Sequence, residues 1–99
     1  MRIAVPHHTT RARAREIVER KIAGLLAQFG DHAGDVRHDW TGDTLQFKGK
    51  ARGFTVEGTV EITDSEVVID GKLPLLAKPF EPRIRQAVER EAESMFRTA

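Results

Sequence analysis

Apolar residues recur along this chain with two different periods, and the change of period divides it into elements. Residues 2–6 alternate weakly and predict a short edge strand, since Pro6 cannot donate a hydrogen bond to a neighbouring strand. Residues 10–29 predict a helix, with Thr9 or Thr10 as the N-cap. The apolar stripe of this helix consists of Ala14, Ile17, Val18, Ile22, Leu25, Leu26 and Phe29.

The middle of the chain alternates apolar and polar residues with period two, which is typical of strands that bury one face. The alternating segments are residues 36–41, 44–48, 54–62 and 67–73. The turn signals between them are Gly42-Asp43, the basic Lys50-Ala51-Arg52 bracketed by Gly49 and Gly53, and Asp64-Ser65. Short turns between successive strands favour an antiparallel meander.

A second helix is predicted over residues 80–97, where Pro79 or Pro82 would lie in the first turn and cost no hydrogen bond. Its apolar stripe consists of Ile84, Ala87, Val88, Ala92, Met95 and Phe96. The whole order is strand, helix, four strands, helix. It predicts an α+β fold, in which an antiparallel meander of about five strands carries two helices packed on one face.

Length and composition narrow the classes of protein that fit. The 99 residues predict a single domain over residues 1–99, and the absence of Cys excludes a disulfide scaffold, a thiolate metal site and a Cys nucleophile. No apolar run approaches the ~20 residues of a membrane-spanning helix, and the first six residues are too quickly polar for a secretion signal. We therefore expect a soluble, cytoplasmic protein. With 39% hydrophobic residues, a chain of this size is expected to have little volume for a large pocket.

The net charge is +1, but the charges are unevenly distributed along the chain. Residues 1–30 carry +4, residues 31–70 carry −5 and residues 71–99 carry +2. This balance is far from that of a dedicated nucleic-acid binder, so no nucleic-acid partner is expected. Because the acidic part falls on the strands and the basic parts fall on the helices, we expect two solvated faces of opposite sign.

Two strand segments form a pattern that carries a family resemblance. Residues 40–47 read W-x-G-D-x-L-x-F, and residues 54–62, which follow, contain V-x-G-x-V. With Pro6-His7 before the first helix and residues 67–80 beyond the strands, the chain resembles the small, bacterial polyhydroxyalkanoic acid system protein family over nearly its whole length. The resemblance implies a link to polyhydroxyalkanoate storage, including the granule surface, but no catalytic residue and no mechanism. The element order is also similar to a miniature helix-grip fold, which says little about function.

Catalysis and metal binding find little support in the residue pattern. The histidines considered as metal ligands are His7, His8, His32 and His38. Neighbouring histidines on an extended segment point to opposite sides, and no Cys completes a site, so structural or exposed roles are favoured, with His7 ordering the start of the first helix. Asp39 and Asp43 could be paired carboxylates, but Asp43 follows Gly42 in a turn, where Asp has local uses. We expect no catalytic residue, no metal and no cofactor, and hence no enzyme.

Arg11, Arg13 and Arg15 are candidates for contact with an anion. Cations at a helix N-terminus oppose the helix dipole, which makes an anionic partner more attractive. The alternative is a solvated helix face on which Arg15 pairs with Glu19. The aromatic candidates are Trp40, Phe47 and Phe54, which either lie in the core between sheet and helices or line a pocket for an apolar ligand.

Residues 73–80 contain more leucine than a connector requires. Either Leu73, Leu76 and Phe80 plug the end of the core, or the segment is an exposed apolar surface for a polymer or a partner. In the second case the candidate interaction surface is Leu73, Leu75, Leu76 and Phe80.

Three hypotheses follow from the sequence. The first is a non-enzymatic accessory protein of the polyhydroxyalkanoate system that binds the granule surface or granule proteins. The second is a small acyl- or lipid-binding protein of helix-grip type. The third is an anion or nucleic-acid binding module that uses Arg11 to Arg15. The edges of an open meander would also allow a homodimer.

Overall fold

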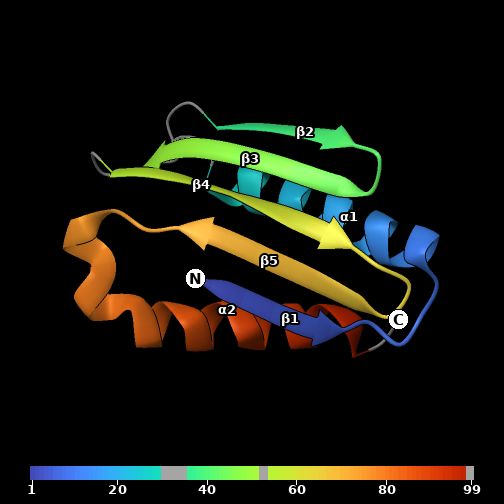
Figure 1. Ribbon diagram of the computed structural model, residues 1–99. Helices are drawn as coiled ribbons and strands as arrows, with labels where there is room; N and C mark the ends of the chain where they lie inside the picture. Colours follow the sequence, from blue (N-terminus) through green and yellow to red (C-terminus); the bar gives the residue numbers. More distant parts are fainter. Residues whose placement is uncertain (30–35, 52–53, 98–99) are drawn as a thin grey trace.

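The structure, a computed structural model, describes residues 1–29, 36–51 and 54–97 (Figure 1). The elements in chain order are β1 (Arg2–Pro6), α1 (Arg11–Phe29), β2 (Arg37–Thr41), β3 (Thr44–Ala51), β4 (Phe54–Ile62), β5 (Glu66–Lys72), the 3₁₀ helix η1 (Leu75–Phe80) and α2 (Glu81–Phe96). The predicted α+β fold and its order of strands and helices are confirmed. The helix-grip likeness stays a prediction.

All five strands form one antiparallel sheet in the order β1-β5-β4-β3-β2. The strands β2 to β5 are the predicted meander. The first strand joins this meander beside the last one, with Ile3 opposite Ile69, so β1 is an edge strand as expected. Two segments that are far apart in the sequence therefore lie side by side.

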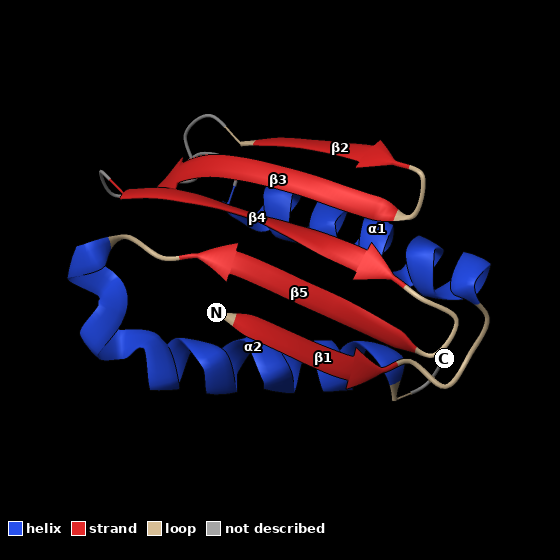
Figure 2. Ribbon diagram, viewed as in Figure 1, coloured by secondary structure: helices blue, strands red, loops and turns tan. Residues whose placement is uncertain are grey.

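Both helices cover the same face of the sheet, behind it in the view of Figure 2. The largest fully buried side chains between the layers are Leu45, His7 and Val67. Val67 pairs with Val5 on one side and with Ile62 on the other, and all three are buried. These residues lie near the β2–β3 and β4–β5 turns, so the tightest packing is at that end of the sheet.

The predicted basic turn at residues 49–53 is wrong in part, because β3 continues to Ala51. Gly49 faces the helices between the exposed Lys48 and Lys50, so the period-two alternation continues through it. Because glycine has no side chain, the sequence does not show that position 49 faces the helices, and the segment looks like a turn. Residues 52–53 lie outside the described residues.

The outer face of the sheet is not simply acidic, as the charge distribution had led us to expect. Its shallow hollow is lined by acidic and basic residues in equal number: Arg37, Lys48 and Lys72 with Asp39, Glu57 and Asp70. The register places Glu57 between Lys48 and Lys72 on the two neighbouring strands. Cross-strand neighbours of opposite charge therefore neutralise this face locally.

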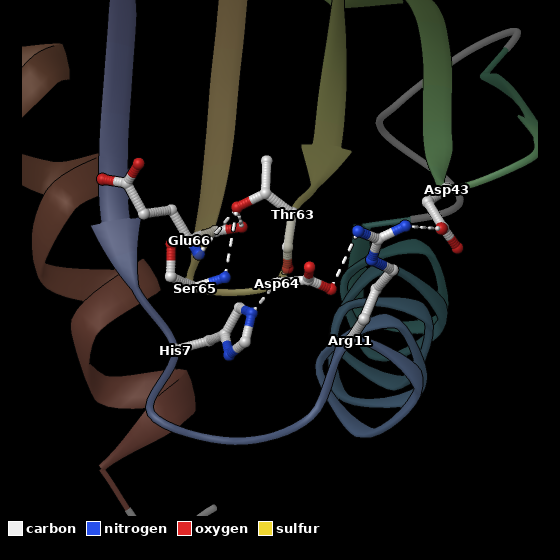
Figure 3. A network of polar contacts seen from close by, with 7 residues as sticks. All are labelled: His7, Arg11, Asp43, Thr63, Asp64, Ser65 and Glu66. Atoms are coloured by element: carbon white, nitrogen blue, oxygen red, sulfur yellow. Dashed lines mark hydrogen bonds and ion pairs between the residues drawn. The ribbon is translucent and has the colours of Figure 1, made fainter.

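His7 is completely buried and ties the end of β1 to the β4–β5 turn (Figure 3). Its Nδ1 accepts a hydrogen bond from the Thr9 N–H at 3.2 Å, so the proton of the neutral ring is on Nε2, which donates to the Thr63 carbonyl at 2.8 Å. The His7 backbone N–H donates to the Ser65 carbonyl at 3.1 Å. The expectation that His7 orders the start of the first helix is thus confirmed, and Thr10 caps that helix by accepting from the Arg13 N–H at 3.1 Å.

Replacement of His7 by alanine is expected to lower the free energy of unfolding by about 2–4 kcal/mol. The substitution removes two hydrogen bonds, leaves their partly buried backbone partners unpaired, and opens a cavity beside Phe96. Urea denaturation measures the change. The matched control is His8→Asn, because His8 is exposed at φ 54° and asparagine tolerates that conformation. We expect the control to stay within about 0.5 kcal/mol of the natural chain, and equal losses in both variants would contradict the role of His7.

Candidate functional site

The connector between β5 and α2, which is the orange turn at the left of Figure 1, exposes three large apolar side chains. Leu75 is 82% exposed, Leu76 is 75% exposed and Phe80 is 57% exposed. We call these three residues the apolar lip. Among the described residues, one other large apolar side chain is exposed: that of Val56, at 38%. The alternative in which Leu76 and Phe80 plug the core is therefore wrong, and Leu73 is half-buried.

Prolines hold the lip away from the core. Pro74, with φ −57° and ψ 150°, ends the strand direction of β5, and its carbonyl accepts a hydrogen bond from the Ala77 N–H at 2.9 Å. Pro79 lies inside η1 and Pro82 lies in the first turn of α2, where a missing N–H costs nothing. Along this backbone path Leu75 and Leu76 stay exposed.

A second feature is an apolar cleft of about 400 Å³ between the sheet and the two helices. Each layer contributes to its wall: Val18 and Ile22 from α1, Val88 and Met95 from α2, and Phe47 and Ile69 from the sheet. This cleft is near the small end of the range of small-molecule sites, so the expectation of little volume for a large pocket stays a prediction. Volumes of about 300–1,000 Å³ are typical of small-molecule sites.

Two paired glycines shape this region, and one of them leaves the space open. Gly58 and Gly71 lie opposite each other on β4 and β5, on the face that is covered by the helices. A Cβ on Gly58 would collide with the backbone oxygen of Asp70 and would approach Phe47 Cζ to 2.8 Å and Gly71 Cα to 2.9 Å, so the strand β5 and Phe47 together occupy the place of the missing side chain. A Cβ on Gly71 would meet nothing closer than Met1 Cε at 3.9 Å. Gly58 thus makes room for Phe47, whereas Gly71 leaves the cleft open.

An empty cleft would be costly. Water would fill the cleft in the free protein, but apolar walls offer it few hydrogen bonds. The displacement of that water by an apolar group is the chemistry that this cleft favours.

The charged residues in the lining are Lys21, Lys72 and Glu91. Lys21 Nζ forms an ion pair with Glu91 Oε2 at 2.7 Å, which connects α1 to α2 at the cleft. Lys72 makes no ion pair within the described residues and is exposed. Its side chain lies on the outer face of the sheet opposite Glu57, so Lys72 brings no charge into the cleft.

The three candidate aromatics have different surroundings. Phe47 lines the cleft, and Trp40 is half-buried beside α1. The Trp40 indole N–H donates to the Glu19 carboxylate, and the Arg15 guanidinium carbon lies 4.6 Å from the centre of the Trp40 ring. The side chain of Phe54 lies outside the described residues.

Arg11 bridges two turns of the sheet (Figure 3). Its guanidinium lies 3.2 Å from the Asp43 carboxylate in the β2–β3 turn and 2.8 Å from the Asp64 carboxylate in the β4–β5 turn. The hydrogen bond to Asp43, and then the charge of Asp64, raise the pKa of Arg11 above its ordinary value. Any stability linked to this shift is present below the ordinary pKa and is lost only at higher pH, so it is retained throughout the physiological range.

The other two candidate arginines also contact groups of this chain. Arg13 forms an ion pair with Glu16 at 3.1 Å, and Arg15 stacks on Trp40 instead of pairing with Glu19 as predicted. An anion would therefore compete with partners that these arginines already have. Contact with an anion stays a prediction.

The residues considered for catalysis or metal binding do not gather in the described part of the chain. No group of three or more His, Cys, Asp or Glu side chains that could hold a metal ion is found there. Asp43 lies in its predicted turn, where its carbonyl accepts a hydrogen bond from the Ile62 N–H at 2.9 Å. His38 Nε2 lies 3.5 Å from Glu19 Oε1, and His32 lies outside the described residues. None of the helices described is long and apolar enough to cross a membrane.

Substitutions of the two paired glycines test the geometry of the cleft. Gly71→Ala is expected to raise the free energy of unfolding by about 0.5–1 kcal/mol, because the added methyl group enters open space and glycine is unfavourable within a strand. Gly58→Ala is expected to lower it by about 1–3 kcal/mol, because the new Cβ would collide with the backbone oxygen of Asp70 on β5 as well as with Phe47, and both must move. Urea denaturation of both variants measures the difference, and the same sign for both would contradict this geometry.

Comparison with known proteins gives one family. The family that is described as putative polyhydroxyalkanoic acid system protein matches residues 1–96. No curated protein and no solved structure gave a significant match. Since the family match covers nearly the whole chain, the chain belongs to this family.

Proposed function

We propose that this member of the polyhydroxyalkanoic acid system protein family is a non-enzymatic accessory protein that docks on the storage polymer. The apolar lip is the docking surface, and the polymer itself is the partner. The protein would then act in the cytoplasm at the surface of the granule. The observation that carries this proposal is the exposure of Leu75, Leu76 and Phe80 in one short segment.

The chemistry of the lip suits this partner. Polyhydroxyalkanoates are aliphatic polyesters, so the surface of a granule offers alkyl groups and ester carbonyls but few hydrogen-bond donors. Aliphatic and aromatic side chains can leave water against such a surface without losing any hydrogen bond. A lip of two leucines and one phenylalanine has no donor or acceptor on its side chains that the polymer would have to satisfy.

The position of the lip also suits docking. The lip follows the end of β5, and the tightest packing lies at the opposite end of the sheet near His7. No residue of η1 is buried, so contact with a surface requires no unfolding. The protein can therefore bind with its core intact.

The expected strength is modest for a single molecule. Complete burial of a leucine or phenylalanine side chain is worth about 1.5–3 kcal/mol, and part of the total is lost to the entropy of association. One lip thus gives weak, reversible attachment. A granule offers a continuous surface, so many molecules can attach at once.

Leu75→Asn combined with Leu76→Asn is expected to lower the partition of the protein onto protein-free polyhydroxybutyrate particles at least tenfold. Each asparagine removes most of the apolar area of an exposed side chain, and a tenfold loss corresponds to about 1.4 kcal/mol. Co-sedimentation with the particles measures the bound fraction. The control is Lys78→Asn, which changes an exposed residue of the same helix but leaves the lip intact.

The same assay separates the other hypotheses. Binding through the lip should persist in high salt, whereas binding through Arg11, Arg13 and Arg15 should weaken as salt screens the charges. Binding to native granules but not to protein-free particles would make granule proteins the partner. Unchanged sedimentation of the double variant would contradict docking by the lip.

A further inference from the structure

The sheet has two edges, and the chain itself closes one of them more than the other. One edge is β1, and the other is β2, which pairs only with β3 among the described strands (Figure 2). On β1, Pro6 has no N–H to offer, and the carbonyl of Arg2 accepts a hydrogen bond from the Arg85 guanidinium at 3.0 Å. The edge at β2 contains no proline.

The turn after β2 decides which of its backbone groups point outward. This two-residue hairpin turn brings Thr41 opposite Thr44, and residues that flank such a turn exchange hydrogen bonds. Hydrogen-bonded and non-hydrogen-bonded pairs alternate along an antiparallel ladder, so His38 and Trp40 direct their N–H and C=O groups away from β3. Of the strands, α1 approaches β4 most closely, which lies two strands inside this edge. In the described part of the chain, the outer side of β2 is therefore open to another strand.

The outer face of β2 carries two exposed charges of opposite sign. Arg37 lies opposite Lys48 on β3, and Asp39 lies opposite Gln46. Within the described ranges neither Arg37 nor Asp39 makes an ion pair. Like charges that face each other across two strands are unfavourable, so a carboxylate on the open side of Arg37 would stabilise it.

We infer that β2 pairs with β2 of a second copy of this chain, antiparallel and centred on His38. This register places Arg37 of each copy opposite Asp39 of the other, which gives two cross-strand ion pairs on the outer face. It also satisfies the backbone, because His38 of each copy directs its N–H and C=O groups toward the other. The two sheets then form one continuous sheet about a two-fold axis.

The face that the helices cover fits the same register. Val36 lies on this face, where its Cγ2 is 3.1 Å from the place of a Cβ on Gly49, and it comes opposite Trp40 of the second copy. Both side chains are half-buried, so their contact removes further apolar area from water. A register centred on Asp39 would instead bring two carboxylates together. Charge and hydrogen bonding thus select one register.

The dimer is weak, because β2 spans only five residues and buries far less surface than a permanent dimer. It forms without the apolar lip, since Leu75, Leu76 and Phe80 lie on another segment. Either surface can therefore fail in an experiment while the other stands. A dimer carries two lips, which strengthens attachment to a continuous polymer surface without any new contact.

Sedimentation equilibrium of the full chain, without polymer, tests this pairing. We expect the natural chain to pass reversibly from monomer to dimer as its concentration rises. Asp39→Arg and Arg37→Asp each bring like charges together, so each should raise the dissociation constant of the dimer about tenfold or more. A natural chain that stays monomeric up to its solubility limit would overturn the inference. Dimerisation of the Arg37→Asp variant like the natural chain would exclude the register centred on His38.

A mixture of the two variants tests the charge pairing directly. Each copy of Asp39→Arg then meets two opposite charges on a copy of Arg37→Asp, so a heterodimer should form although neither variant pairs with itself. The matched control is Asp70→Arg, which makes the same substitution at an exposed position of the same face, on β5. We expect this control to dimerise like the natural chain. Loss of its dimer would place the contact on the sheet face, and a mixture without heterodimer would contradict the ion pairs.

Amide hydrogen exchange locates the contact on the natural chain. The N–H groups of His38 and Trp40 should exchange more slowly at high protein concentration, because the dimer gives them carbonyl partners. The N–H of Ala4 is the internal control: Met1 and Gly71 exchange hydrogen bonds, so Ala4 directs its backbone groups outward on β1. Slower exchange at Ala4 alone would place the contact at the other edge. Protection of β2 by a granule protein, but not by a second copy, would make a foreign strand the occupant, and either result overturns the inference.

Discussion

The buried imidazole of His7 is the contact on which the arrangement of this fold depends. The chain must bring β1 beside β5 and then cross to the other layer to begin α1. His7 holds that crossing with one ring nitrogen on Thr63 of the β4–β5 turn and the other on Thr9 before the helix. Arg11 adds ion pairs to Asp43 and Asp64 just beyond it. Three connections are thereby held together at one end of the sheet.

The opposite end is built differently, and the two candidate sites lie there. Gly58 makes room for Phe47, and the missing side chain of Gly71 leaves an apolar cleft beneath the helices. Beyond it, Pro74 ends β5 and turns the next leucines outward. A molecule with one closely packed end can keep its fold while the other end offers apolar surface. This separation of stability from binding surface is the physical basis of docking by the apolar lip.

The sequence predicted the fold more completely than the sites. Periodicity located both helices and nearly all strand residues, because a sheet with one covered face must alternate. It failed at Gly49, where a residue without a side chain leaves no signal. It could name Phe47 as a pocket candidate but could not find the cleft, since the pairing of Gly58 with Gly71 depends on register. It left the exposure of Leu76 and Phe80 open, because the same residues could have closed the core.

The sequence by itself determined the α+β class, the single apolar face of the sheet, the turn at Asp43 and the family. These depend on local periodicity, on turn chemistry and on motifs that are contiguous along the chain. Only the tertiary structure decided that Arg15 stacks on Trp40, that the outer face is neutralised across strands, and that a cleft lies over Gly71. Each of these joins residues from different elements, and their meeting depends on register and layer packing, which no spacing within one segment encodes.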